Sequence, residues 1–232
     1  MSSKETTPVK RKRNVDLDQI PYSTITRLTQ YLRVVEKLDE LGVSNISSAE
    51  LSEETKINSF LVRKDLSYFG EFGTRGVGYE IPILRREIRH ILGLNRKHKT
   101  IVVGAGNLGR ALVHYRGFLD KGFEICAVFD SDPDKIGRQL EEFYIQSVFN
   151  LEEYLQSHQE IAIGIIAVPL TSAQFIANLL VANGIQGILN FAPVALEIPP
   201  DVVYVPVDLT THLEVISFYI THPGAYRPSK LE

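Results

Sequence analysis

The sequence has one cysteine, one methionine and no tryptophan among its 232 residues. Because Cys126 is the only cysteine, an intramolecular disulfide and a zinc site built from several cysteines are both excluded. Cys126 lies inside an apolar run at 125–129, where we expect a small core side chain.

Long apolar segments are absent as well. No stretch approaches the roughly 18 uninterrupted apolar residues of a membrane span, and the N-terminal residues are polar, unlike a signal peptide. The hydrophobic fraction of 44% and the charged fraction of 23% are ordinary for globular domains. We therefore expect a cytoplasmic chain of one or two domains with no membrane partner.

Charge is unevenly distributed along the chain. The formal net charge is −3, but residues 1–99 carry +5 and residues 100–232 carry −8. A basic half favours contact with a polyanion such as nucleic acid, although chance surface charge gives the same imbalance. Residues 1–19 are expected to be disordered, and their basic run at 10–13 is either a DNA-contacting arm or a solvated tail.

Local signals in the basic half predict a helix-turn-helix. A first helix is expected over 21–41, on one stripe of apolar residues at three- and four-residue steps. Ser47 and Glu50 form a capping box that starts a short helix over 48–55, and Asn58 is a good N-cap for the next helix, over 59–69. Short helix, tight turn and amphipathic helix are typical of this motif.

The helix at 59–69 has two contrasting faces. Val62, Leu66 and Phe69 share an apolar face, and the opposite face carries Phe60, Arg63, Lys64 and Ser67. Cations beside hydrogen-bonding and apolar groups suit contact with bases and phosphates in a DNA major groove. The alternative is a plain αα-hairpin with a solvated charged face.

The segment that follows, 70–79, is too rich in glycine for a helix and suits a tight β-hairpin with Arg75 near its tip. A hairpin directly after a recognition helix is the wing of a winged helix, and a tip arginine there is attracted by the negative potential of a minor groove. A linking helix is expected over 82–92, before a basic linker at 96–99.

A second fold begins at residue 100. A β-branched strand at 100–103 runs into the glycine motif G-x-G-x-x-G at 104–109, which opens a helix to about residue 118. Gly104 permits the tight turn, Gly106 admits a pyrophosphate, and Gly109 allows close packing of helix and strand. Asp130 ends the next strand, where an acid accepts hydrogen bonds from ribose hydroxyls and repels a 2′-phosphate, so NAD(H) is preferred over NADP(H). The alternative is a similar fold for another nucleotide such as coenzyme A.

The remaining chain alternates strands and helices. Strands are expected at 161–168, 187–191 and 203–205, and helices at 151–158 and 172–183. Ligands in open α/β sheets bind beyond the carboxyl ends of strands. With the glycine motif, this rule nominates as cofactor-binding residues Ala105, Asn107, Leu108, Val168, Pro169, Asn190, Phe191 and Ala192, although plain loop or core positions are the alternative.

The last predicted helix, 213–220, is apolar on all sides. Such a helix is unsuited to a free surface, so we expect it to pack against a second copy of the chain in a dimer. An intramolecular core helix is the alternative.

The segments 62–79, 91–95 and 188–193 closely resemble the Rex family of redox-sensing repressors, and the resemblance extends over about 20–220. It implies a homodimer that exchanges its C-terminal helix, binds double-stranded operator DNA, and leaves the DNA when NADH replaces NAD⁺. Carried over to this chain, the DNA contacts include Arg63, Lys64, Tyr68 and Arg75, and the glycine motif with Asp130 holds NAD(H).

The resemblance also implies a polar switch, for which Arg33, Tyr115 and Asp208 lie at suitable positions; ordinary surface polarity is the alternative. Leu209 departs from the pattern, because some members of the family carry an aromatic residue there, near the nicotinamide.

The predicted fold class is therefore α/β, with a winged helix-turn-helix at 20–94, a NAD(P)-binding Rossmann domain at 95–208 and a swapped C-terminal helix and tail at 209–232. The predicted function is a redox-sensing repressor, not an enzyme. The rival is an NAD-dependent dehydrogenase, but His114, Tyr115, His212 and His222 form no recognisable catalytic set in the sequence.

Overall fold

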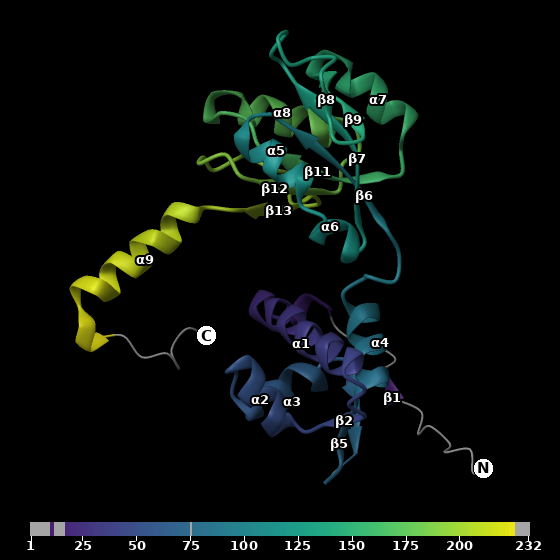
Figure 1. Cartoon of the computed structure of the whole chain (residues 1–232), viewed down its shortest axis with the longest axis vertical. Coiled ribbons are helices and arrows are strands. Elements are labelled where there is room, and N and C mark those ends of the chain that lie inside the picture. Colours follow the sequence, from purple (N-terminus) through teal and green to yellow (C-terminus); the bar gives the residue numbers. More distant parts are fainter. Residues whose placement is uncertain (1–9, 12–16, 75, 226–232) are drawn as a thin grey trace. The chain divides into compact units, whose positions relative to one another are not determined.

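The computed structural model describes residues 10–11, 17–74 and 76–225 (Figure 1). It divides into two compact units, with the boundary in the chain between Asn95 and Arg96. We call them the N-terminal unit and the C-terminal unit. Among the described residues, no helix has the length and apolar character needed to cross a membrane.

The N-terminal unit is a winged helix. Its helices are α1 (Tyr22–Glu40), α2 (Ser48–Thr55), α3 (Ser59–Ser67) and α4 (Ile81–Ile91). Strands β2 (Asn45–Ile46), β5 (Gly78–Glu80) and β4 (Gly73–Thr74) form an antiparallel sheet in that order. The predicted helix-turn-helix and hairpin are confirmed, although α3 ends two residues before the predicted limit.

Two short elements precede α1: β1 (Lys10–Arg11), paired with β3 (Gly70–Glu71), and the 3-10 helix η1 (Leu17–Gln19). Disorder was expected here, and for these five residues the structure differs. Antiparallel pairing with β3 supplies backbone hydrogen bonds, and the local sequence of β1 does not predict this pairing.

The local signals of the helix-turn-helix act as predicted. The Ser47 side chain accepts a hydrogen bond from the Glu50 N–H, and the Glu50 carboxylate accepts one from the Ser47 N–H (2.7 Å). The Asn58 side chain caps α3 by accepting from the Phe60 N–H at 2.8 Å. Between the two helices, Lys56 adopts a left-handed conformation with φ of 62°, which makes the tight turn.

A buried polar cluster ties α3 to α1. The Asp65 carboxylate is 1% exposed and accepts two hydrogen bonds from the Arg27 guanidinium, at 2.7 and 2.8 Å. It also accepts from the hydroxyls of Tyr31 (2.8 Å) and Thr24 (3.0 Å). Removal of one partner from a buried pair of this kind costs about 3–5 kcal/mol. The cluster therefore fixes the position of α3 in its unit.

The C-terminal unit is a doubly wound Rossmann domain. Its six parallel strands lie in the order β10 (Gln146–Ser147), β7 (Phe123–Asp130), β6 (His98–Val103), β11 (Ile161–Ile166), β12 (Gly187–Asn190) and β13 (Val203–Pro206). Numbered along the chain, this order is 3-2-1-4-5-6, that of the dinucleotide-binding fold. The predicted fold class is confirmed.

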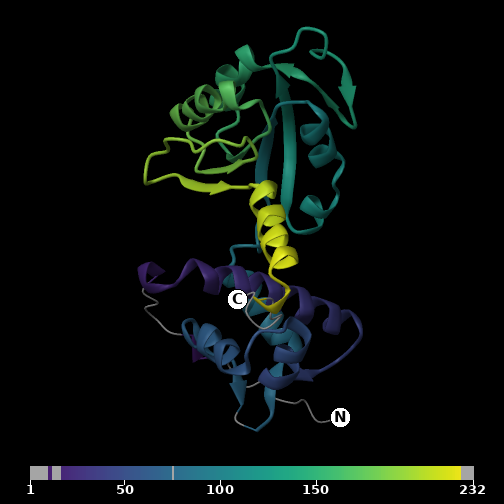
Figure 2. The same cartoon turned by 90° about the vertical axis from the view of Figure 1, so that its left-hand side faces the viewer.

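Helices cover both faces of this sheet (Figure 2). Helices α7 (Leu151–Ser157) and α8 (Leu170–Ala182) pack on one face, in a core with Ile101 and Val103. Helix α5 (Asn107–His114) packs on the other face with Val102, beside the hairpin of β8 (Gln139–Leu140) and β9 (Phe143–Tyr144). Successive residues of β6 therefore face opposite cores, as strand geometry requires.

Several boundaries differ from those predicted. Helix α5 ends at His114, and a separate short helix, α6 (Gly117–Asp120), follows. Strands β8, β9 and β10 were not predicted, because two-residue strands carry no readable periodicity. Cys126 is half-buried, and its partial burial is the main cause that raises the pKa of its thiol.

Helix α9 (Leu209–Thr221) follows β13 and contains no buried residue. Asp208 caps it through the Thr210 N–H at 2.9 Å, so the helix starts before the predicted residue 213. Its large apolar side chains are exposed, Leu213 by 63% and Ile220 by 73%. Helix α9 therefore forms no part of the described hydrophobic core of the C-terminal unit.

Candidate functional sites

The outward face of α3 is the first candidate site. Phe60 is 64% exposed, and Arg63, Lys64 and Ser67 are exposed too, whereas the opposite face of α3 is buried in the core of the unit. These four predicted residues share one accessible face. Tyr68, by contrast, is half-buried against the core at the C-cap of α3, and Arg75 lies outside the described residues.

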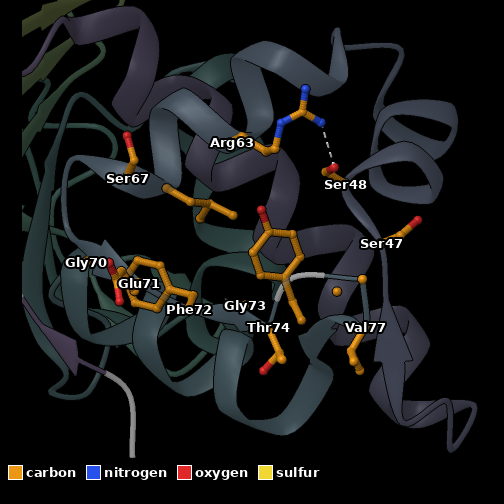
Figure 3. Close-up of a pocket in the computed structure, with 14 residues that line it drawn as sticks. Ser47, Ser48, Arg63, Ser67, Gly70, Glu71, Phe72, Gly73, Thr74 and Val77 are labelled. Carbon is orange, nitrogen blue, oxygen red and sulfur yellow. Dashed lines mark hydrogen bonds between the residues drawn. The ribbon is translucent and has the colours of Figure 1, made fainter.

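A groove of about 560 Å³ lies between α3, the start of α2 and the hairpin strands (Figure 3). The Arg63 guanidinium donates a hydrogen bond of 2.9 Å to the Ser48 hydroxyl, which holds its charge over the groove. Ser47, Ser48 and Thr74 add further polar groups to the lining. Sequence reasoning used Ser47 only as a helix cap and missed this groove, because three separate elements form it.

The glycine motif forms the second candidate site, between the ends of β6 and β11. A Cβ at Gly104, where φ is +107°, would lie 2.4 Å from the Ala167 carbonyl oxygen. A Cβ at Gly109 would lie 1.7 Å from the Gly104 carbonyl oxygen. Only glycine fits at either position, so the first turn of α5 approaches the strand closely.

Gly106 is glycine for a different reason. It is the N-cap of α5, its φ of −75° is open to any residue, and no atom lies within 4 Å of a Cβ built there. The space beside the N-cap of α5 is therefore open. A helix N-terminus with open space before it fits an anionic group such as a pyrophosphate.

Asp130 stands beside this turn at the end of β7. Its carboxylate accepts hydrogen bonds from the Ala105 N–H (2.7 Å), the Asp132 N–H (2.9 Å) and the Lys135 ammonium (3.2 Å). Burial by itself raises the pKa of Asp130, but these hydrogen bonds outweigh it and the pKa is lowered. The side chain is therefore a carboxylate at neutral pH, suited to accept from sugar hydroxyls.

The other predicted pocket residues divide into two groups. Val168, Pro169 and Phe191 follow strands β11 and β12 at the same edge of the sheet as the glycine motif, and Asn107 and Leu108 are exposed on the first turn of α5. Asn190, however, is 1% exposed.

The Asn190 amide donates to the carbonyls of Ala192 and Val194 and to the Tyr204 hydroxyl, and its oxygen accepts from the Ala192 N–H. All its polar groups are thus used within the fold. Asn190 and Ala192 shape the edge of the sheet instead of offering free polar groups.

The three predicted switch residues lie on separate elements. Arg33 is exposed on α1, in the N-terminal unit. Tyr115 is 60% exposed at the end of α5, with its ring edge-on to Phe118. The Asp208 carboxylate is bound by Thr210 and Thr211, and these hydrogen bonds lower its pKa. Among the described residues of the C-terminal unit, no hydrogen bond or ion pair is found between the side chains of Tyr115 and Asp208.

A winged helix-turn-helix in one unit and a Rossmann domain in the other define the class of a ligand-responsive transcription regulator. The family model "Putative DNA-binding protein N-terminus" matches residues 19–67, and the model "CoA binding domain" matches residues 95–194.

Relatives match over most of the chain. It is 48% identical to the redox-sensing transcriptional repressor Rex of Carboxydothermus hydrogenoformans, over 87% of this chain and 97% of the relative. It is 49% identical to Rex of Thermus thermophilus, over 88% and 96%. The crystal structure of RSP, a Rex-family repressor, has a TM-score of 0.81 and 35% identity, over 88% of this chain and 95% of RSP. RSP in complex with β-NAD⁺ and operator DNA has a TM-score of 0.85 and 36% identity, over 88% and 94%.

The chain therefore belongs to the Rex family of redox-sensing transcriptional repressors. The predicted family is confirmed, and the dehydrogenase alternative is not supported, because these relatives are repressors and not enzymes. Coenzyme A, the alternative nucleotide, is named in the description of the family model that matches the Rossmann part.

The second and third glycines of the motif, Gly106 and Gly109, are expected to respond differently to alanine. Gly109→Ala places a methyl group on a backbone oxygen and should lower the free energy of unfolding by about 3 kcal/mol or more, because the packing cannot relax. Gly106→Ala meets no atom and should cost no more than about 1 kcal/mol, the scale of an altered N-cap. Urea denaturation followed by circular dichroism measures both. Equal losses in the two variants would contradict the distinct roles given to them.

Proposed function

We propose that this chain represses transcription by binding operator DNA through α3 and the wing, and that NADH bound in place of NAD⁺ releases it. The observation that carries the proposal is the open, glycine-lined N-terminus of α5 beside Asp130, in a chain whose other unit exposes the basic face of α3. The structures of RSP with β-NADH, and with β-NAD⁺ and operator DNA, support the same reading for a relative.

The dinucleotide fits the residues present. The N–H groups at the start of α5 would face the pyrophosphate, and Gly106 leaves the space for it. Asp130 would accept from the ribose hydroxyls and disfavour a 2′-phosphate. NAD⁺ and NADH differ by one hydride and one ring charge, which is the signal that the bound cofactor supplies. The protein's part is to bind the two forms with different affinity in its DNA-bound and DNA-free states.

DNA contact is proposed for the exposed face of α3. Arg63 and Lys64 point away from the core, and Arg63 is held by Ser48 at the rim of the groove. Side chains of this kind suit base edges and phosphates in a major groove. The position of Arg75 in the wing sequence supports a minor-groove contact, which we keep as a proposal.

Replacement of Arg63 or Lys64 by alanine should weaken binding to a palindromic operator by about 1–3 kcal/mol if the side chain contacts a base. If the side chain contacts a phosphate instead, its replacement should weaken binding to all sequences alike and reduce the salt dependence of binding. Gel shifts at several salt concentrations distinguish the two. Arg85→Ala is the matched control, because Arg85 is a cation on α4 that pairs with Asp39 at 2.6 Å. Unchanged affinity in both α3 variants would contradict the winged-helix interface.

A homodimer through α9 is the second part of the proposal. The helix exposes several large apolar side chains, among them Phe218 at 52% and Ile216 at 53%. Burial of each such side chain contributes about 1.5–3 kcal/mol. A second copy of the chain offers the same helix in return, which favours an exchange of α9 between protomers.

Ile216→Glu should therefore convert the dimer to a monomer, because a carboxylate would be buried in the apolar interface. Sedimentation equilibrium measures the mass. Phe149→Glu is the control, since Phe149 is 83% exposed in η2 (Val148–Asn150), outside α9. A wild-type chain that sediments as a monomer, or an Ile216→Glu variant that remains dimeric, would contradict the exchange.

The third part of the proposal is a switch formed by Arg33, Tyr115 and Asp208, through which cofactor binding changes DNA binding. We propose that the Asp208 carboxylate pairs with Arg33 of the partner protomer in one state only, with Tyr115 positioned by the pair. A pair present in one state shifts the equilibrium toward that state by its own free energy. In the described chain Asp208 caps α9, so a test by alanine alone would also remove the cap.

Operator DNA should weaken NADH binding by the same factor by which NADH weakens DNA binding, because coupling between two sites is reciprocal. NADH titrations with and without saturating operator measure this factor. Asp208→Ser keeps an N-cap and removes the charge, whereas Asp208→Ala removes both. Coupling should fall in both variants. Coupling that survives in Asp208→Ser would exclude the carboxylate from the switch, and wild-type NADH affinity unaffected by operator would contradict redox sensing.

A further inference from the structure

Lys135 lies beside the carboxylate that the proposed function assigns to the cofactor ribose. Its ammonium is 3.2 Å from one oxygen of Asp130 and 3.5 Å from the Asp132 carboxylate. Sequence reasoning assigned the adenosine end of the pocket to Asp130 alone. The structure adds a cation to that end.

The loop after β7 holds Lys135 in this position. The Asp132 carboxylate accepts from the Asp134 N–H at 2.9 Å, and the Asp132 carbonyl accepts from the Lys135 N–H at 3.0 Å. These bonds make a tight turn that returns the chain toward Asp130. The Lys135 side chain is 36% exposed, so it can reach solvent or a ligand without any change in the core.

The Asp130 carboxylate has little capacity to spare. Two oxygens accept about four hydrogen bonds, and Ala105, Asp132 and Lys135 already use three of these positions. An adenosine ribose offers two hydroxyls, so binding through both requires Lys135 to move away from Asp130 or to share an oxygen with the sugar. In either case Lys135 remains beside the ribose as a cation.

A cation in that place acts on a 2′-phosphate in the opposite sense to Asp130. Asp130 repels the phosphate that distinguishes NADPH from NADH, and Lys135 attracts it. The two charges lie within one ion pair, so neither sets the selectivity independently of the other.

We propose that Lys135 is a specificity-determining residue of the dinucleotide site, and that the Asp130–Lys135 pair, not Asp130 alone, sets the preference for NADH over NADPH. This inference rests on the proposed binding of NAD(H). It predicts that loss of Lys135 sharpens the selectivity, whereas loss of the Asp130 charge with Lys135 retained reduces it.

The test compares the dissociation constants of NADH and NADPH in the full-length chain. Both carry the same fluorescent nicotinamide, and the chain has no tryptophan to absorb or emit beside it. Lys135→Gln should raise the ratio of the NADPH constant to the NADH constant about tenfold, the scale of one partly exposed charge near a phosphate.

Lys99→Gln is the matched control. Lys99 also forms an ion pair, with Glu160 at 2.8 Å, and its side chain is 41% exposed. Lys99 lies near the start of β6, whereas Asp130 lies at the carboxyl end of the neighbouring parallel strand β7. The substitution removes the same charge from the same unit, and the ratio should stay at the wild-type value.

A double-mutant cycle separates Lys135 from Asp130. Asp130→Asn should lower the ratio of the NADPH constant to the NADH constant. When Lys135→Gln is added to Asp130→Asn, the ratio should rise again, because no cation is left to attract the 2′-phosphate. A wild-type ratio in Lys135→Gln, or NADPH binding equally tight in Asp130→Asn with and without Lys135, would overturn the role of Lys135 while NADH binding stands. A wild-type chain that binds neither dinucleotide would overturn the proposed function itself.

Discussion

The close approach of the first turn of α5 to the end of β6 is the constraint on which the C-terminal unit depends. The Gly104 and Gly109 positions leave no room for a Cβ, so the start of α5 lies against the backbone. This placement brings the Ala105 N–H within 2.7 Å of Asp130 and leaves Gly106 facing open space. A single steric requirement thus sets the anion site and the carboxylate in one edge of the sheet, at the point where its strand order reverses.

In the N-terminal unit, a buried charged side chain positions the helix α3. A short helix such as α3 depends on tertiary contacts for most of its stability. Asp65, on the buried side of α3, is held by Arg27, Tyr31 and Thr24 of α1, which satisfy the carboxylate in full. Because an unpaired buried charge is so costly, this arrangement admits one seating of α3, and the face that contains Arg63 is presented outward.

Helix α9, unlike α3 and α5, is not positioned by packing within the described chain. Asp208 caps its start, but the described chain buries none of its apolar side chains. In the proposed dimer a second protomer would complete this apolar surface, and α9 would respond to how the two protomers are arranged. A local change at the dinucleotide site would then have a route to a change between subunits, which a helix packed in its own core does not provide.

The sequence alone determined the features that local signals and their order along the chain record. These are the capping box of Ser47, the cap at Asn58, the buried and exposed faces of α3, and the order of strand, glycine motif, helix and Asp130. Only the tertiary structure decided which polar groups were already used. The amide of Asn190, expected in the pocket, donates its hydrogen bonds to backbone carbonyls and to Tyr204. The carboxylate of Asp65 is bound by partners 34 to 41 residues away in the sequence. The guanidinium of Arg63 meets Ser48 from another helix, and Lys135 shares the carboxylate of Asp130. Periodicity and caps record interactions along one element, whereas hydrogen-bond capacity is divided among elements that only folding brings together.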